Sequence, residues 1–113
     1  GTAVIVEDTK GKGYGRDTIM TMSAYAFYEV GLNRLWGSII DYNEPSFKAY
    51  VGKSGWKVEG KLRNHIFRNG TFHDLYYVAC LKNDFESVPD AKNYLRSYVS
   101  LEKFKFTESV QKI

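Results

Sequence analysis

Hydrophobic positions in the first third of the chain predict a strand, a helix and a second strand. Thr2 to Glu7 is a short apolar run, rich in β-branched residues and ended by polar ones, which is typical of a buried strand. From Asp17 to Val30 apolar residues recur near helical spacing, and Gly31 follows where helices commonly end. Leu35 to Ile40 predicts the next strand. Short connections around one helix imply a parallel strand pair with a right-handed crossover.

A second helix is predicted between Asn43 and Gly55. Asn43 or Ser46 can cap it, because short polar side chains accept hydrogen bonds from the first free backbone N–H groups of a helix. Pro45 is tolerated in the first turn, where its missing N–H would have had no partner. The helix is expected to run to about Ser54, with Gly55 as its stop.

Asn69-Gly70 is the strongest turn signal in the chain. It separates two strand-like runs, Trp56 to Phe67 and Thr71 to Leu81. Asn-Gly favours the tight turn whose backbone twist matches that of two neighbouring antiparallel strands. We therefore expect an antiparallel hairpin here.

The last stretch, Ser87 to Ile113, has a different pattern. Ser87 or Asp90 could cap a helix, and Phe104 and Phe106 alternate with lysines as in a short strand. The apolar positions of the expected helix share one face: Ala91, Tyr94, Leu95, Tyr98 and Val99. The chain is thus expected to divide into an α/β region over residues 1–84 and a helical tail over residues 85–113, packed on the core or on a partner.

Between the first strand and the first helix stands a glycine-rich segment, KGKGYGR, at residues 10–16. A strand, a glycine loop and a helix together can direct backbone N–H groups at a phosphate. Glycine permits backbone conformations and close approaches that a Cβ would block. Lys10, Lys12 and Arg16 add positive charge to this segment. The alternative interpretation is a plain turn.

Composition fits one globular domain of 113 residues with a formal net charge of +3. This mild charge suits an anionic ligand but argues against a nucleic-acid partner, for which a basic stripe is expected. Cys80 is the single cysteine, which excludes an internal disulfide, and its apolar surroundings predict a buried, inert thiol. A chain without disulfides fits a reducing compartment, so a cytoplasmic location is expected. No stretch is long and apolar enough to span a membrane.

The order of elements, together with three motifs, resembles the C-terminal part of the GNAT N-acetyltransferases, most closely the branch that modifies ribosomal-protein N-termini. The first motif is the glycine-rich segment, where Lys10 replaces the family's usual Arg or Gln. The second is Asn43 followed by Ser46 in a helix that ends at Gly55-Trp56. The third is Glu59-Gly60 with a Gly-x-x-x-Asp sequence at residues 70–74. The resemblance covers about residues 2–84 and implies a GNAT-like βαβαββ half-fold.

The resemblance implies acetyl-CoA as the cofactor. Backbone amides of residues 10–16 would bind its pyrophosphate, residues 4–6 would pair with its pantetheine arm like an added strand, and Asn43 would hydrogen-bond that arm. Asn43 could equally be a helix cap, or serve both roles. The implied cofactor-binding residues are Val4, Ile5, Val6, Lys10, Gly11, Lys12, Gly13, Tyr14, Gly15, Arg16, Asn43 and Ser46.

Tyr50 resembles the family's general acid, which protonates the leaving thiolate. The second helix is one residue longer than the family pattern, so Tyr50 keeps the usual distance from Asn43 while Val51 keeps the usual distance from Gly55. Which of the two faces the thioester stays open. Candidates for the general base are Glu7, Asp8, Glu59, His73 and Asp74, with a structural role in the hairpin favoured for Glu59. No pair of residues has metal-ligand spacing.

The chain begins where the family has its fourth strand, so the earlier elements that form much of the acceptor-binding wall have no counterpart. The free edge of the first strand would then be exposed, which natural proteins avoid. We expect the rest of a longer protein, a second copy of the chain or the tail from Ser87 to cover it. The implied function is transfer of an acetyl group from acetyl-CoA to a primary amine, on a small molecule or a peptide, by this chain or by a protein of which it is a fragment. The alternative is a catalytically inactive, truncated GNAT protein that binds the cofactor or forms oligomers.

Overall fold

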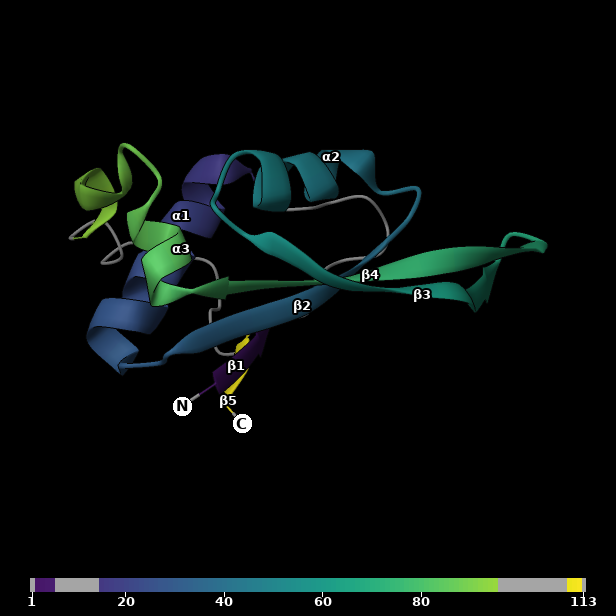
Figure 1. Cartoon of the computed structure of the whole chain (residues 1–113), viewed down its shortest axis with the longest axis horizontal. Helices are drawn as coiled ribbons and strands as arrows, with labels where there is room; N and C mark the ends of the chain where they lie inside the picture. The colour runs from purple at the N-terminus through teal and green to yellow at the C-terminus, as the bar shows by residue number, and fades with distance from the viewer. Residues whose placement is uncertain (1, 6–14, 96–109, 113) are drawn as a thin grey trace.

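A computed structural model describes residues 2–5, 15–95 and 110–112 of the chain (Figure 1). Its elements follow the predicted order of strand, helix, strand, helix and hairpin, so the α/β half-fold is confirmed. The elements are β1 (Thr2–Ile5), α1 (Arg16–Ala24), η1 (Tyr25–Val30), β2 (Arg34–Ile40), α2 (Glu44–Phe47), η2 (Lys48–Gly52), β3 (Lys57–Arg68), β4 (Thr71–Leu81), α3 (Lys82–Glu86), η3 (Ala91–Tyr94) and β5 (Val110–Lys112).

The strands form one sheet in the order β3-β4-β2-β1-β5. β1 and β2 are parallel, as predicted from the single helical connection between them, and Val4 lies opposite Trp36. The remaining pairs are antiparallel. The predicted hairpin is formed by β3 and β4, and both turn residues, Asn69 and Gly70, have the positive φ angles (52° and 80°) that this type of tight turn requires.

The first helix starts as predicted but widens into a π-helix from Tyr25 onward. It ends at Gly31, whose φ of 81° is the left-handed conformation expected at a helix terminus. Its buried side chains form the centre of the core: Ile19, Met20, Met22, Ser23, Ala24, Ala26 and Phe27. Val30, predicted to share this face, is only partly buried, because the π-helical turns rotate the end of the helix away from the regular spacing.

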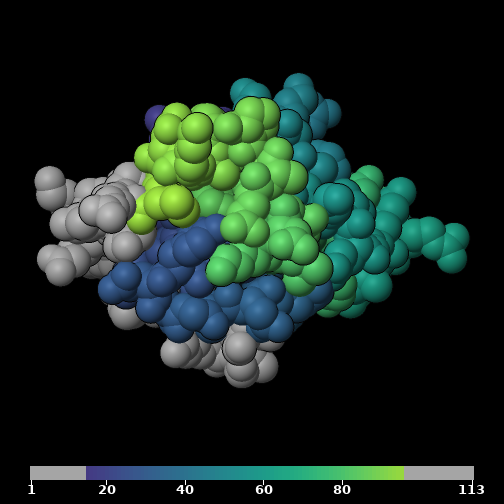
Figure 2. Space-filling model, turned by 60° about the vertical axis from the view of Figure 1, so that its left-hand side comes forward, coloured from purple at the N-terminus to yellow at the C-terminus, as the bar shows by residue number. Residues whose placement is uncertain are grey.

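The helices α1, α2 and α3 lie on the same face of the sheet, and the core fills the layer between (Figure 1). After β4 the chain returns to this layer, where α3 and η3 pack against α1 and η1 (Figure 2). Phe85 of α3 is completely buried, with its ring 6.0 Å from that of Phe27. Cys80 is also completely buried, as predicted, and burial raises the pKa of its thiol.

The tail departs from the expected continuous helix. Ser87 ends α3 instead of capping a new helix, and Asp90 precedes only the four-residue 3₁₀-helix η3. The predicted helical positions Tyr98 and Val99, and the predicted strand around Phe104 and Phe106, lie outside the described residues. Near the chain end, β5 pairs with the free edge of β1, so the third of the three expected ways to cover that edge is the one observed.

Candidate functional site

The structure describes only part of the predicted cofactor site. Val4 and Ile5 lie in β1, next to β2, and Gly15 is the residue from which α1 begins. Asn43 and Ser46 lie at the start of α2. The remaining predicted cofactor-binding residues other than Arg16 lie outside the described residues: Val6, Lys10, Gly11, Lys12, Gly13 and Tyr14.

Asn43 and Ser46 form a buried polar pair at the exit from β2. The Asn43 side chain caps α2, since its Oδ1 accepts a hydrogen bond from the backbone N–H of Ser46 at 3.3 Å. The two residues are 3% and 1% exposed, yet Nδ2 of Asn43 and Oγ of Ser46 have no hydrogen-bond partner among the described residues. Buried polar groups are nearly always paired, so these two atoms are candidates for contact with a bound water or ligand.

The extra residue between Asn43 and Gly55 is absorbed by the π-helix η2. A π-helical turn holds one more residue than an α-helical turn, and such turns often occur at functional sites. Tyr50 lies within η2, is 2% exposed and packs edge-on against Trp56 with ring centres 4.8 Å apart. Val51 is only partly buried. Tyr50 is therefore the residue directed into the core, while its catalytic role stays a prediction.

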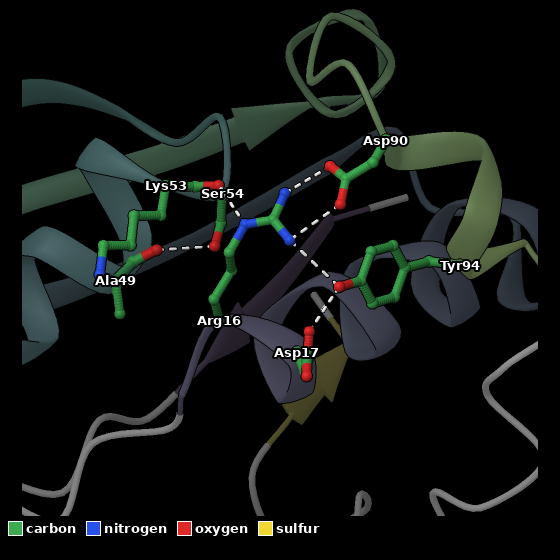
Figure 3. Close-up of polar contacts among 7 residues, drawn as sticks. All are labelled: Arg16, Asp17, Ala49, Lys53, Ser54, Asp90 and Tyr94. Carbon is green, nitrogen blue, oxygen red and sulfur yellow. Dashed lines mark hydrogen bonds and ion pairs between the residues drawn. The ribbon is translucent and has the colours of Figure 1, made fainter.

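The Arg16 side chain has a structural task that the sequence did not reveal (Figure 3). Its guanidinium forms an ion pair with Asp90, in which Nη1 donates to Oδ2 at 3.0 Å and Nη2 to Oδ1. Nε donates to the carbonyl of Lys53 at 3.0 Å, and Nη1 also donates to Tyr94 Oη at 3.1 Å. Tyr94 in turn donates to Asp17 at 2.5 Å. The positive charge expected to face a phosphate is thus paired with a carboxylate, and only the backbone amide of Arg16 keeps the predicted role.

This ion pair makes the attachment of the tail sensitive to acid. The hydrogen bond from Arg16 lowers the pKa of the Asp90 carboxyl. A lowered carboxyl pKa adds stability above the unfolded-state value, and this stability is lost as the pH falls through the folded value. We expect Asp90→Asn to lower the free energy of unfolding at neutral pH, with the difference from wild type shrinking as the pH falls below about 4. Urea unfolding of both chains from neutral to acidic pH measures the difference in the free energy of unfolding. A difference that does not decrease as the pH falls would contradict the assignment.

The candidate bases lie in different surroundings. Glu59 forms an ion pair with Arg34, whose hydrogen bond lowers the pKa of the carboxyl, which fits the structural role favoured for it. Asp74 accepts a hydrogen bond from the backbone N–H of Asn64 at 2.8 Å, which lowers its pKa and ties the two strands together where β3 bulges. His73 contacts Asp41, a residue without a signal of its own in the sequence. Glu7 and Asp8 lie outside the described residues.

The described part of the chain contains no group of three or more His, Cys, Asp or Glu residues that could hold a metal ion. Within the same residues, no helix is both long and apolar enough to cross a bilayer.

Comparison with known proteins identifies the class to which this fold and this site belong. Residues 2–76 match the family model described as "Acetyltransferase (GNAT) domain". The chain therefore belongs to the GNAT acetyltransferase family. It is 35% identical over 82 residues to a Bacillus subtilis protein named "Putative ribosomal N-acetyltransferase YdaF", a match that covers 73% of this chain and 44% of that protein. The chain thus spans less than half the length of this relative.

Solved structures agree with the family assignment. A GNAT-family acetyltransferase from Bacillus anthracis is 29% identical, with a TM-score of 0.55, and the match covers 64% of this chain and 43% of that one. Mutant forms of the spermidine/spermine N-acetyltransferase SpeG from Vibrio cholerae are 25% identical, with a TM-score of 0.58 and coverage of 68% and 46%.

Proposed function

We propose that this chain supplies the acetyl-CoA-binding region of an N-acetyltransferase whose acceptor is a primary amine. The observation that carries the proposal is the buried polar pair at the start of α2, Nδ2 of Asn43 and Oγ of Ser46. An unpaired buried polar group costs about 1–3 kcal/mol. A ligand that pairs with both atoms would supply the hydrogen-bond partners that they lack among the described residues.

The predicted cofactor-binding residues keep their roles in this proposal, except that the Arg16 side chain is paired with Asp90. The amides of residues 10–16 bind the pyrophosphate. Val4 and Ile5 are paired with β2 along one edge of β1 and with β5 along the other, so the predicted pairing of this strand with the pantetheine arm requires one neighbouring strand to separate from it. Asn43 donates to the arm through Nδ2 while Oδ1 continues to cap α2, so the cap and the ligand contact use different atoms. Bound acetyl-CoA supplies the acyl group as a reactive thioester.

Transfer requires the acetyl carbon to exchange its bond to sulfur for a bond to the amine nitrogen. Tyr50 is proposed to give its phenolic proton to the departing thiolate. Its burial against Trp56 keeps the phenol out of bulk water. The names of the relatives include ribosomal and spermidine/spermine N-acetyltransferases, which supports nitrogen as the acceptor atom without selecting one amine.

A thermal unfolding titration tests cofactor binding. A ligand that binds only the folded state stabilises it, by about 2.7 kcal/mol at a concentration 100 times its Kd. We expect acetyl-CoA to raise the unfolding midpoint progressively, and free adenosine diphosphate, which lacks the pantetheine arm, to do so much less. An unchanged midpoint in millimolar acetyl-CoA, with intact and monodisperse protein, would refute the proposal. Thiol release with a panel of primary amines then separates an enzyme from a module that binds without turnover.

A further inference from the structure

An imidazole and a carboxylate meet where β2 ends beside β4. His73 Nδ1 lies 2.9 Å from Asp41 Oδ1. Asp41 is itself held in place, because its Oδ2 accepts a hydrogen bond from the backbone N–H of Asp74 at 2.8 Å and its own N–H donates to the Asp74 carbonyl at 3.0 Å. Both carboxylate oxygens therefore have fixed partners, and the imidazole is held by an anchored group.

This contact determines which nitrogen of His73 can act as a base. A carboxylate only accepts hydrogen bonds, so Nδ1 carries a proton, and in the neutral imidazole Nε2 then has the basic lone pair. The Tyr42 ring packs edge-on against the imidazole at 4.9 Å and restricts its rotation. The His73 side chain is 17% exposed, so it is partly shielded but still accessible. An imidazole oriented by a carboxylate through Nδ1 is the arrangement that enzymes use for a general base.

Asp41 also lines a cavity of about 360 Å³. The cavity walls are Asp41, Glu44, Phe47, Lys48 and Tyr76. The two aromatic rings of the cavity, Phe47 and Tyr76, have their centres 5.3 Å apart. Together with the two carboxylates they favour an organic ammonium ion over an anion as the ligand, and Lys48 offsets part of the negative charge. The cavity adjoins the start of α2, where Asn43 is proposed to bind acetyl-CoA.

We propose that His73 is the general base of the transfer reaction and that Asp41 positions it; this inference rests on the proposed function. Nε2 of His73 takes one proton from the acceptor, which converts R–NH₃⁺ into R–NH₂. The amine nitrogen then attacks the thioester carbonyl, and the C–S bond breaks as the C–N bond forms. The nitrogen loses a second proton, and the departing thiolate gains one, so these two transfers balance. The His73 proton leaves to solvent, so the products are the acetylated amine, coenzyme A and H⁺.

His73→Asn tests the base without removing the contact to Asp41. The asparagine amide occupies the place of Nδ1 and can still donate to the carboxylate, but no basic nitrogen replaces Nε2. Loss of a general base costs about 100-fold or more in rate. We expect this loss in kcat/KM with an alkyl amine, together with unchanged acetyl-CoA affinity and thermal midpoint. The matched control, His65→Asn, changes an exposed histidine on the neighbouring strand and should leave all three values unchanged.

Two further measurements distinguish a base from a structural histidine. With trifluoroethylamine, a primary amine already neutral at neutral pH, His73→Asn should lose much less activity, because no ammonium proton has to be removed. Nitrogen-15 NMR of the imidazole should show the Nδ1–H tautomer in the wild-type chain and a shift toward Nε2–H in Asp41→Asn. An equal loss with both amines, or an Nε2–H tautomer in the wild type, would overturn the inference. Acetyl-CoA binding without turnover by the wild-type chain would overturn it as well, while the absence of binding would refute the proposed function itself.

Discussion

Replacing Gly55 with alanine should strongly destabilise the fold. Gly55 has a φ of 82°, and a Cβ there would lie 2.6 Å from the carbonyl oxygen of Asp84 and 2.8 Å from Val88 Cγ2. The left-handed backbone costs an alanine roughly 1–2 kcal/mol, and overpacking against backbone adds about 1–3 kcal/mol. We therefore expect the free energy of unfolding to fall by about 3 kcal/mol.

Gly31→Ala is the matched control, because it isolates the backbone conformation from the collision. Gly31 has nearly the same φ, 81°, but a Cβ there meets nothing within 4 Å. It should lose only the roughly 1–2 kcal/mol of backbone strain. Urea unfolding gives the free energy of unfolding of both variants. The difference between the two values measures how tightly α3 is held against the turn before β3. Equal losses of stability in the two variants would show that α3 can move away from the added methyl group at little cost.

Removing the buried polar atoms of Asn43 and Ser46 should weaken cofactor binding without weakening the fold. Serine caps a helix about as well as asparagine but has no Nδ2, so Asn43→Ser keeps the cap and removes the amide donor; the shorter hydroxyl is taken up by the cap. Ser46→Ala removes a buried hydroxyl that has no partner in the described residues, and should raise the free energy of unfolding by about 1 kcal/mol. For each variant we expect the acetyl-CoA Kd to rise roughly tenfold, the loss of about one hydrogen bond. Calorimetric titration with acetyl-CoA measures the Kd of each variant.

Ser23→Ala provides the control for this experiment. Ser23 is as deeply buried as Ser46, but its hydroxyl donates to the carbonyl of Ile19 at 2.7 Å. Its removal should lower stability slightly and leave the acetyl-CoA Kd unchanged. If Asn43→Ser and Ser46→Ala also bind with the wild-type Kd, neither residue contacts the cofactor and the proposed site is wrong.

The sequence by itself determined the elements whose signals are local. Gly31 ends the first helix and Asn69-Gly70 turns the hairpin, because each adopts a positive φ that few other residues tolerate. Asn43 caps α2 because its side chain reaches an amide only three residues away. The order of these elements, with the motifs in them, was enough to indicate membership of the GNAT family. The family match over residues 2–76 confirmed that membership. In the described part of the tail, α3 ends at Glu86 and the four-residue η3 follows and packs on α1, whereas the rest of the predicted tail helix lies outside the described residues.

Only the tertiary structure decided the partners of the charged side chains. Arg16 was expected to face a phosphate, but it pairs with Asp90, 74 positions along the chain. His73 and Asp41, 32 positions apart, meet because β2 and β4 are neighbours in the sheet. The sequence also left open which residue of η2 turns inward, and the π-helix placed Tyr50 there. Helices and turns are encoded within a few residues, whereas an ion pair depends on how distant elements pack, and no short stretch of sequence contains that information.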